Sequence, residues 1–259
     1  MNTLFRYFVR YLFWPLFFIS HLLTVSLLSW HLWAQVNFAY QLDYKLLDIE
    51  AQIQEFAPHN RYKQEFEYTT PEEHWELFAQ IVNSIQNHGK GLAEITYKLP
   101  NGTNTPFMHR AEVIHLQDVA NLIDTFYTTG IIAGVLWIFL LIIAYRNKLL
   151  FPSLKKVLLG CCAAIVVISI TIISLGAKNV FYWFHTKIFP EGHQWFFYYE
   201  DSLMTTLMKA PDIFGLIALL LVSVVIVFWI GSIWASNKLL VKHYQKPVYN
   251  PSKKSKRKK

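Results

Sequence analysis

Three residues with acid–base side chains, Glu112, His115 and Asp118, follow one another at steps of three in residues 111–127. Residues three apart share one face of a helix, so the three side chains would project together. A carboxylate beside an imidazole fixes its tautomer and raises its basicity, which suits general acid–base chemistry. The alternative interpretation is a solvated helix face that carries a histidine by chance.

A second candidate, His185, lies in an aromatic segment, since ten of the 19 residues between positions 181 and 199 are Phe, Tyr or Trp. Such a run is typical of the headgroup layer of a membrane, where ring bodies are buried and polar edges stay wet. His185 is therefore either a second candidate for acid–base chemistry or an incidental part of an aromatic anchor at the membrane interface. His109, His115, His185 and His193 could instead bind a metal, but their spacing matches no compact zinc pattern.

Four apolar stretches must position these residues. Each lacks Asp, Glu, Lys and Arg and approaches or exceeds the roughly 20 helical residues that cross a bilayer; they are residues 11–33, 126–145, 157–177 and 213–235. Only 16% of the chain is charged, against about 25% in soluble proteins. We expect a mainly α membrane protein with four transmembrane helices and a small, mostly helical extracytoplasmic domain. The first stretch is too long for a signal peptide, so we expect it to be retained.

The net charge of +7 divides unevenly along the chain. Residues 1–10, 146–156 and 236–259 carry fifteen basic and no acidic residues, whereas residues 34–125 and 178–212 carry nine basic and all seventeen acidic ones. The positive-inside rule then places both termini and the 146–156 loop in the cytoplasm and the two larger segments outside. The Lys-rich tail is interpreted as an orientation signal that touches anionic lipid, not as a nucleic-acid arm.

Within residues 34–125 the clearest helix signal begins at Thr70. Thr70 is the expected N-cap, Pro71 the first helical residue and Glu73 the capping-box partner, with Gly89 as the stop.

Other signals in the same segment are weaker. Residues 37–56 predict an amphipathic helix that continues outward from the first span, and residues 95–99 predict a strand followed by a turn at 101–102. The helix that carries His115 runs into the second span. We therefore expect both His115 and His185 at or just above the outer membrane surface.

Three short motifs occur in order outside the membrane. Residues 112–119 (EVIHLQDV) resemble the pattern E-x-x-H-M-x-D-V, residues 184–189 (FHTKIF) resemble F-H-x-x-F-F, and residues 195–204 (WFFYYEDSLM), running to Pro211, resemble W-x-F…D-x-L-I…P. Together with the four spans, they resemble the Lit family of integral membrane proteins, whose characterised member is a lipoprotein intramolecular transacylase. The departures are Leu116 for Met, Ile188 for Phe, and Tyr199 where Pro or Asn is usual.

The resemblance implies a specific reaction in the bacterial cytoplasmic membrane. Such enzymes take a diacylated lipoprotein and move the second acyl chain of its glycerol onto the α-amino group of the N-terminal cysteine. The implied partners are this substrate and membrane lipids, with no nucleic acid, metal or soluble cofactor. The two essential histidines of the family match His115 and His185.

Amine attack on an ester needs a group that takes the amine proton and a group that protonates the departing oxygen. The hypothesis is that His115, oriented by Glu112 or Asp118, is the general base, while His185 stabilises the oxyanion or protonates the leaving oxygen. The reverse assignment fits the same residues.

The remaining expected site residues support the histidines or the lipid. Asp201 would support His185, and Phe184, Phe189 and Trp195 would hold the acyl chains.

Two other functions fit the sequence. One is a membrane-anchored sensor or assembly factor with structural histidines, and the other is an acyltransferase acting on a different lipid donor.

Overall fold

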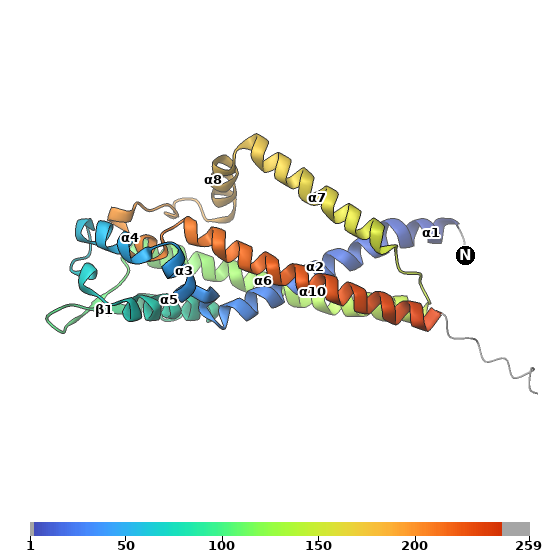
Figure 1. Ribbon diagram of the computed structural model, residues 1–259, viewed down its shortest axis with the longest axis horizontal. Helices are drawn as coiled ribbons and strands as arrows, with labels where there is room; N and C mark the ends of the chain where they lie inside the picture. The colour runs from blue at the N-terminus through green and yellow to red at the C-terminus, as the bar shows by residue number, and fades with distance from the viewer. Residues whose placement is uncertain (1–2, 245–259) are drawn as a thin grey trace, which may run out of the picture.

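The computed structural model describes residues 3–244 and consists mainly of helices (Figure 1). Four helices are long and apolar enough to cross a membrane, which confirms the predicted fold class. The first joins α1 (Thr3–Phe8) through a π-helical turn to α2 (Trp14–Ala34), and the others are α6 (Arg110–Arg146), α7 (Leu154–Leu175) and α10 (Asp212–Tyr244). The third predicted span runs two residues past the C-terminal end of its helix, because Gly176 adopts φ +81° and ends α7. Residues 245–259, with most of the Lys-rich tail, lie outside the described residues.

Three of the long helices, α2, α6 and α10, pack together as a bundle. The closest approach is between α2 and α6, where a Cβ on Gly130 would lie 2.6 Å from Leu27 Cδ2. In contrast, α7 diverges from the bundle and meets α8 (Ala177–Ile188) at its C-terminal end (Figure 1). No residue of α7 is buried by protein, so its apolar surface is left for lipid.

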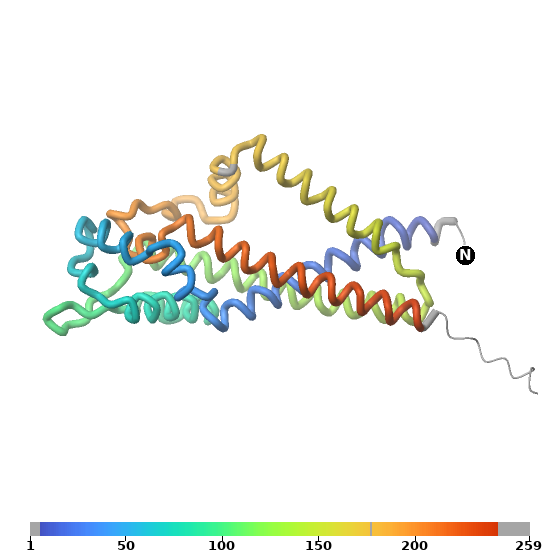
Figure 2. The backbone as a smooth tube through the Cα atoms, in the orientation of Figure 1, coloured from blue at the N-terminus to red at the C-terminus, as the bar shows by residue number. Residues whose placement is uncertain are grey.

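A cap of short elements lies at the end of the bundle that is away from the N-terminus (Figure 1). It contains α3 (Tyr40–Leu46), α4 (Ile49–Phe56), α5 (Pro71–Gln86), the antiparallel hairpin β1 (Thr96–Lys98) and β2 (Asn104–Pro106), and α9 (Leu203–Met208). Figure 2 shows that residues far apart in the sequence meet there, since the segment after α8 returns to the elements that follow α2. Their shared core includes Ile53, Phe66, Leu77, Tyr97 and Leu207, each almost inaccessible to solvent. This core also contains Leu116 of α6 and Ile213 of α10, so the cap packs on this end of the bundle, while a second cluster around Phe17 and Leu140 lies along the long helices.

The predicted start of α5 is confirmed in part. The Thr70 hydroxyl accepts a hydrogen bond from the Glu73 amide at 3.3 Å, as an N-cap should. The Glu73 carboxylate, however, accepts from the Lys98 amide of β1 at 2.8 Å. The expected capping-box residue therefore ties α5 to the hairpin. The predicted stop at Gly89 is confirmed only in part: α5 ends at Gln86, His88 (φ 60°) is the left-handed residue after the C-cap, and the Gly89 amide closes the end by donating to the Ser84 carbonyl at 2.8 Å.

The prediction of one helix over residues 37–56 is wrong. Asn37, Phe38 and Ala39 adopt φ of 49°, 51° and 58°, and Asp48 at φ 51° separates α3 from α4. This left-handed backbone is costly for non-glycine residues. The turn buries the Phe38 ring 4.9 Å from Trp30, and burial of an aromatic side chain offsets the cost. The chain thus bends at two points, and α3 and α4 lie as two separate short helices beyond the end of α2 (Figure 1).

Candidate active site

His115 lies in the second turn of α6, whose first turn has a well-formed cap. The His109 ring accepts from the Ala111 amide at 3.2 Å, and the Glu112 carboxylate accepts from the His109 amide at 2.7 Å. Because this cap fixes where the helix begins, it also fixes the direction of the side chain one turn later. The His115 ring packs against Phe189 at 5.0 Å and Phe197 at 5.9 Å between ring centroids.

His185 lies in the last turn of α8 and is enclosed by aromatic rings. Its centroid is 3.9 Å from that of Phe181 and 4.9 Å from that of Trp195. The Nδ1 atom lies 2.8 Å from the Phe181 carbonyl oxygen. A carbonyl oxygen can only accept, so Nδ1 must carry the proton of this bond. In the neutral ring, the lone pair is therefore on Nε2.

One ring connects the two histidines. Phe189 contacts His115 on α6 and, at 5.4 Å, also contacts His185 on α8. The two imidazoles are 70 positions apart in the sequence, and the divergence of α7 followed by the return of α8 brings them to one end of the bundle. The structure thus places together the two histidines that the motifs select.

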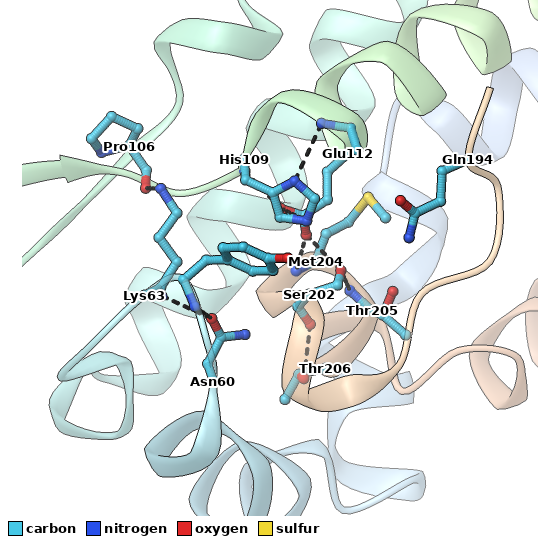
Figure 3. A network of polar contacts seen from close by, with 12 residues as sticks. Asn60, Lys63, Pro106, His109, Glu112, Gln194, Ser202, Met204, Thr205 and Thr206 are labelled. Atoms are coloured by element: carbon cyan, nitrogen blue, oxygen red, sulfur yellow. Dashed lines mark hydrogen bonds and ion pairs between the residues drawn. The ribbon is translucent and has the colours of Figure 1, made fainter. Parts of the chain in front are cut away.

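The Glu112 carboxylate forms its hydrogen bonds with residues other than His115. Its side chain is only 1% exposed, and besides the His109 amide it accepts from the Ser202 hydroxyl at 2.5 Å and the Met204 amide at 3.2 Å. Figure 3 shows this carboxylate between the first turn of α6 and the first turn of α9. Because the carboxylate accepts from three donors, it links the first turn of α6 to the first turn of α9. Among the described residues these three donors are its hydrogen-bond partners, and His115 is not one of them.

The other two expected supporting carboxylates also have different partners. Asp118 accepts from Nδ1 of His193 at 2.6 Å. Asp201 forms an ion pair with Arg61 at 2.9 Å, so it links the segment before α9 to the cap. In the part of the chain that the structure describes, these are the only hydrogen bonds of the Asp118 and Asp201 carboxylates.

The expected lipid-binding residues surround His185. Trp195 and Phe189 contact its ring, and Phe184 lies 5.8 Å away with 44% of its surface exposed. The aromatic segment therefore forms one wall of the site while leaving apolar surface uncovered, as a site for acyl chains requires.

Some residues of the site were missed from the sequence. Ser202 has no distinguishing signal beyond its position at the start of a helix, and Phe197 is one ring among ten. His193 was weighed only as a metal ligand. A carboxylate 75 positions away cannot be recognised as its partner without the fold. No group of three or more His, Cys, Asp or Glu side chains within residues 3–244 is arranged to hold a metal ion.

Comparison with known proteins identifies the fold and family. The model of the family described as "Lipoprotein intramolecular transacylase Lit" matches residues 15–211. The chain belongs to the Lit family. The resemblance noted from the three motifs is therefore confirmed, and with it an acyltransferase-type enzyme that is integral to the membrane. No curated protein sequence matches this chain significantly.

Solved structures of the membrane-integral Lit from Bacillus cereus share the fold. Two of them carry a substitution of one histidine, by arginine in one and by alanine in the other. Each superposes with a TM-score of 0.64 at 17% identity over 93% of this chain, and over 96% and 98% of the respective Bacillus chains. A third gives a TM-score of 0.59 at 18% identity over 89% of this chain and 95% of that chain.

Proposed function

We propose that this Lit-family protein moves an acyl chain within a diacylated bacterial lipoprotein, from its diacylglyceryl group to the α-amino group of the N-terminal cysteine. The observation that carries the proposal is the pair of imidazoles that share Phe189 at the capped end of the bundle. Both reactants belong to one molecule, so holding them together supplies much of the rate.

The reaction forms one bond and breaks another. The amine nitrogen attacks the ester carbonyl carbon, a C–N bond forms, and the C–O bond to glycerol breaks. Starting from the neutral amine, the proton that leaves the nitrogen ends on the glycerol oxygen, so mass and charge are unchanged. A single imidazole can take this proton and then deliver it.

His185 is the group that we assign to this proton transfer. Its Nδ1–H is held by the Phe181 carbonyl, which leaves Nε2 as an acceptor in the neutral ring. His115 is assigned the oxyanion, to which a neutral imidazole donates one N–H. The tautomer of His185 thus supports the reverse of the roles expected from the sequence. The proposed supporting roles of Glu112, Asp118 and Asp201 are to hold the segments that carry and cover the two rings.

The location is part of the proposal. The active site faces the extracytoplasmic side of the cytoplasmic membrane, with both termini in the cytoplasm. The distribution of basic residues supports this orientation. Phe184, Phe189 and Trp195 would then meet the substrate's acyl chains at the outer interface.

The test uses the purified protein in a bilayer with a synthetic diacylated lipopeptide. Fragment masses locate the acyl chain, which should migrate without any change in total mass. His115→Ala and His185→Ala should each lower the rate by at least about 100-fold. Full transacylation by either variant would sink the assignment.

Two further variants separate the roles. His185→Asn keeps a donor for the Phe181 carbonyl but has no group that can accept a proton, so it should be as inactive as His185→Ala. His115→Gln keeps an N–H donor and should retain more activity than His115→Ala. If His185→Asn instead retained more activity than His185→Ala, and His115→Gln were as inactive as His115→Ala, proton transfer would be assigned to His115.

A further inference from the structure

Residues 189–197, here called the strap, cross the site without regular secondary structure. The strap begins at Phe189 and ends at Phe197, and both of these rings pack on His115. Between them, Trp195 packs on His185. Residues 190–194 are exposed, so the middle of the strap has little apolar burial to hold it in place.

A single side chain fastens this exposed middle to α6. The His193 amide donates to the Pro190 carbonyl at 3.2 Å, and Gly192 between them adopts φ +85°. This is the geometry of a type II turn, in which the third residue needs positive φ. The turn carries the His193 ring to α6, where Nδ1 lies 2.6 Å from Asp118 Oδ2.

Asp118 is well placed to act as the fixed half of this contact. Its side chain is 11% exposed, against 40% for His193, and it follows His115 by three residues, on the same face of α6. Whatever holds the strap at Asp118 therefore holds it across His115. A short hydrogen bond to a carboxylate is among the stronger polar contacts.

We propose that His193 is a positioning residue for the transacylation, because its contact with Asp118 fastens the strap across both catalytic imidazoles. The proposal rests on the proposed function for its effect on rate. The fastening itself does not, and can be measured separately. The strap reaches the two imidazoles through Phe189, Trp195 and Phe197 and not through His193, so we assign His193 the fastening and not the proton transfer.

The experiment compares two substitutions at one position. His193→Leu removes the donor while keeping an apolar side chain. His193→Asn keeps a donor at the same number of bonds from the backbone as Nδ1. The matched control is His88→Leu, because His88 forms a similar pair at 2.9 Å with Asp124, two turns further along the same helix. Each variant is studied as the full chain in bilayer nanodiscs.

The first measurement is amide hydrogen exchange, which needs no substrate. Exchange in peptides covering residues 190–198 should be at least several-fold faster in His193→Leu than in the unsubstituted protein. It should be unchanged in His193→Asn and in His88→Leu, and peptides from α5 should be unchanged in all three. Equal exchange of the strap in His193→Leu and the unsubstituted protein would overturn the proposal.

The second measurement is kcat and KM on the diacylated lipopeptide. His193→Leu should lower kcat by roughly 10-fold to 100-fold, the scale of a misplaced reacting group, with a much smaller change in KM. His193→Asn should restore most of kcat. If His193→Asn protects the strap yet stays as slow as His193→Leu, His193 acts chemically and the positioning role is wrong. If the unsubstituted protein does not transacylate, the proposed function fails while the exchange result still decides the fastening.

Discussion

Glu112 is a carboxylate withdrawn from water to join two helix starts. A buried carboxylate is tolerated where donors surround it, and Glu112 has one hydroxyl and two backbone amides. Ser202, one of these donors, is itself the N-cap of α9 and accepts from the Thr205 amide at 2.9 Å. The glutamate of the E-x-x-H motif therefore aligns the helix that carries His115 with the segment that follows the aromatic wall.

Removing this carboxylate should cost stability. Glu112→Ala leaves three buried donors without an acceptor, at about 1–3 kcal/mol each, so the free energy of unfolding should fall by about 3 kcal/mol or more. Glu112→Gln keeps one acceptor oxygen and should lose less. The measurement is thermal unfolding in detergent, with the exposed Glu76→Ala on α5 as control. Were Glu112→Ala to unfold at the same temperature as Glu76→Ala but lose activity, Glu112 would act on His115 directly.

At the scale of residues, the sequence predicts the candidate site residues better than it predicts their contacts. The motifs select His115 and His185, and the structure brings both to one ring. The carboxylate partners could not be predicted, because helical spacing places Glu112 and Asp118 on the face of His115 without saying which distant donors reach them first. Ser202 and His193, respectively 90 and 75 positions away, reach them.

At the scale of the elements, the main feature is the close packing of α2 against α6, the helix that carries His115. Gly130 and Gly134 on α6 form a small-xxx-small pattern, which allows helix backbones to approach in a membrane. A Cβ on Gly130 would meet both Cδ2 and Cβ of Leu27, at 2.6 and 2.7 Å. Leu27 Cβ is fixed to its backbone, so no change of rotamer relieves the second contact.

Gly130→Ala should therefore push α2 and α6 apart. Overpacking of this kind costs about 1–3 kcal/mol, and the unfolding temperature in detergent should fall accordingly. Gly160→Ala on α7 is the matched control, because nothing lies within 4 Å of its added Cβ. Equal unfolding temperatures for the two variants would show that the contact is not tight in the folded protein.

Element prediction succeeded where the signal was local and failed where it was not. The long apolar stretches, the Thr70 N-cap and the strand before the turn at residues 101–102 all depend on neighbouring residues, and all are present, whereas the second strand of the hairpin was not predicted. The reversal at residues 37–39 depends on the burial of Phe38 against Trp30, a contact that no periodicity reveals. The helix α8, expected only as an aromatic loop, begins immediately after the Gly176 break.

Over the whole molecule, the acidic and basic residues are separated between the two ends of the helical bundle. The capped end of the bundle carries every acidic residue of the chain, while the opposite end connects α6 to α7 through a basic loop. The cap packs on the bundle through a common cluster of buried residues. The orientation of the helices in the membrane therefore also sets the side on which His115 and His185 lie.

This orientation can be measured with single cysteines. In a protein with Cys161→Ala and Cys162→Ala, we expect Asn101→Cys, in the hairpin turn, to react with a membrane-impermeant maleimide in intact cells. Asn147→Cys, in the exposed link between α6 and α7, should react only after the membrane is permeabilised. The reverse pattern would place the site in the cytoplasm and exclude the proposed substrate.

The isolation of α7 has a consequence for how the two imidazoles are spaced. Because no residue of α7 is buried by protein, we expect its tilt to follow the surrounding lipid, and tilt responds to hydrocarbon thickness. The helix α8 follows α7 directly, so a change in this tilt would move His185 relative to the bundle. We therefore expect the acyl-chain length of the host bilayer to change the spacing of the two imidazoles.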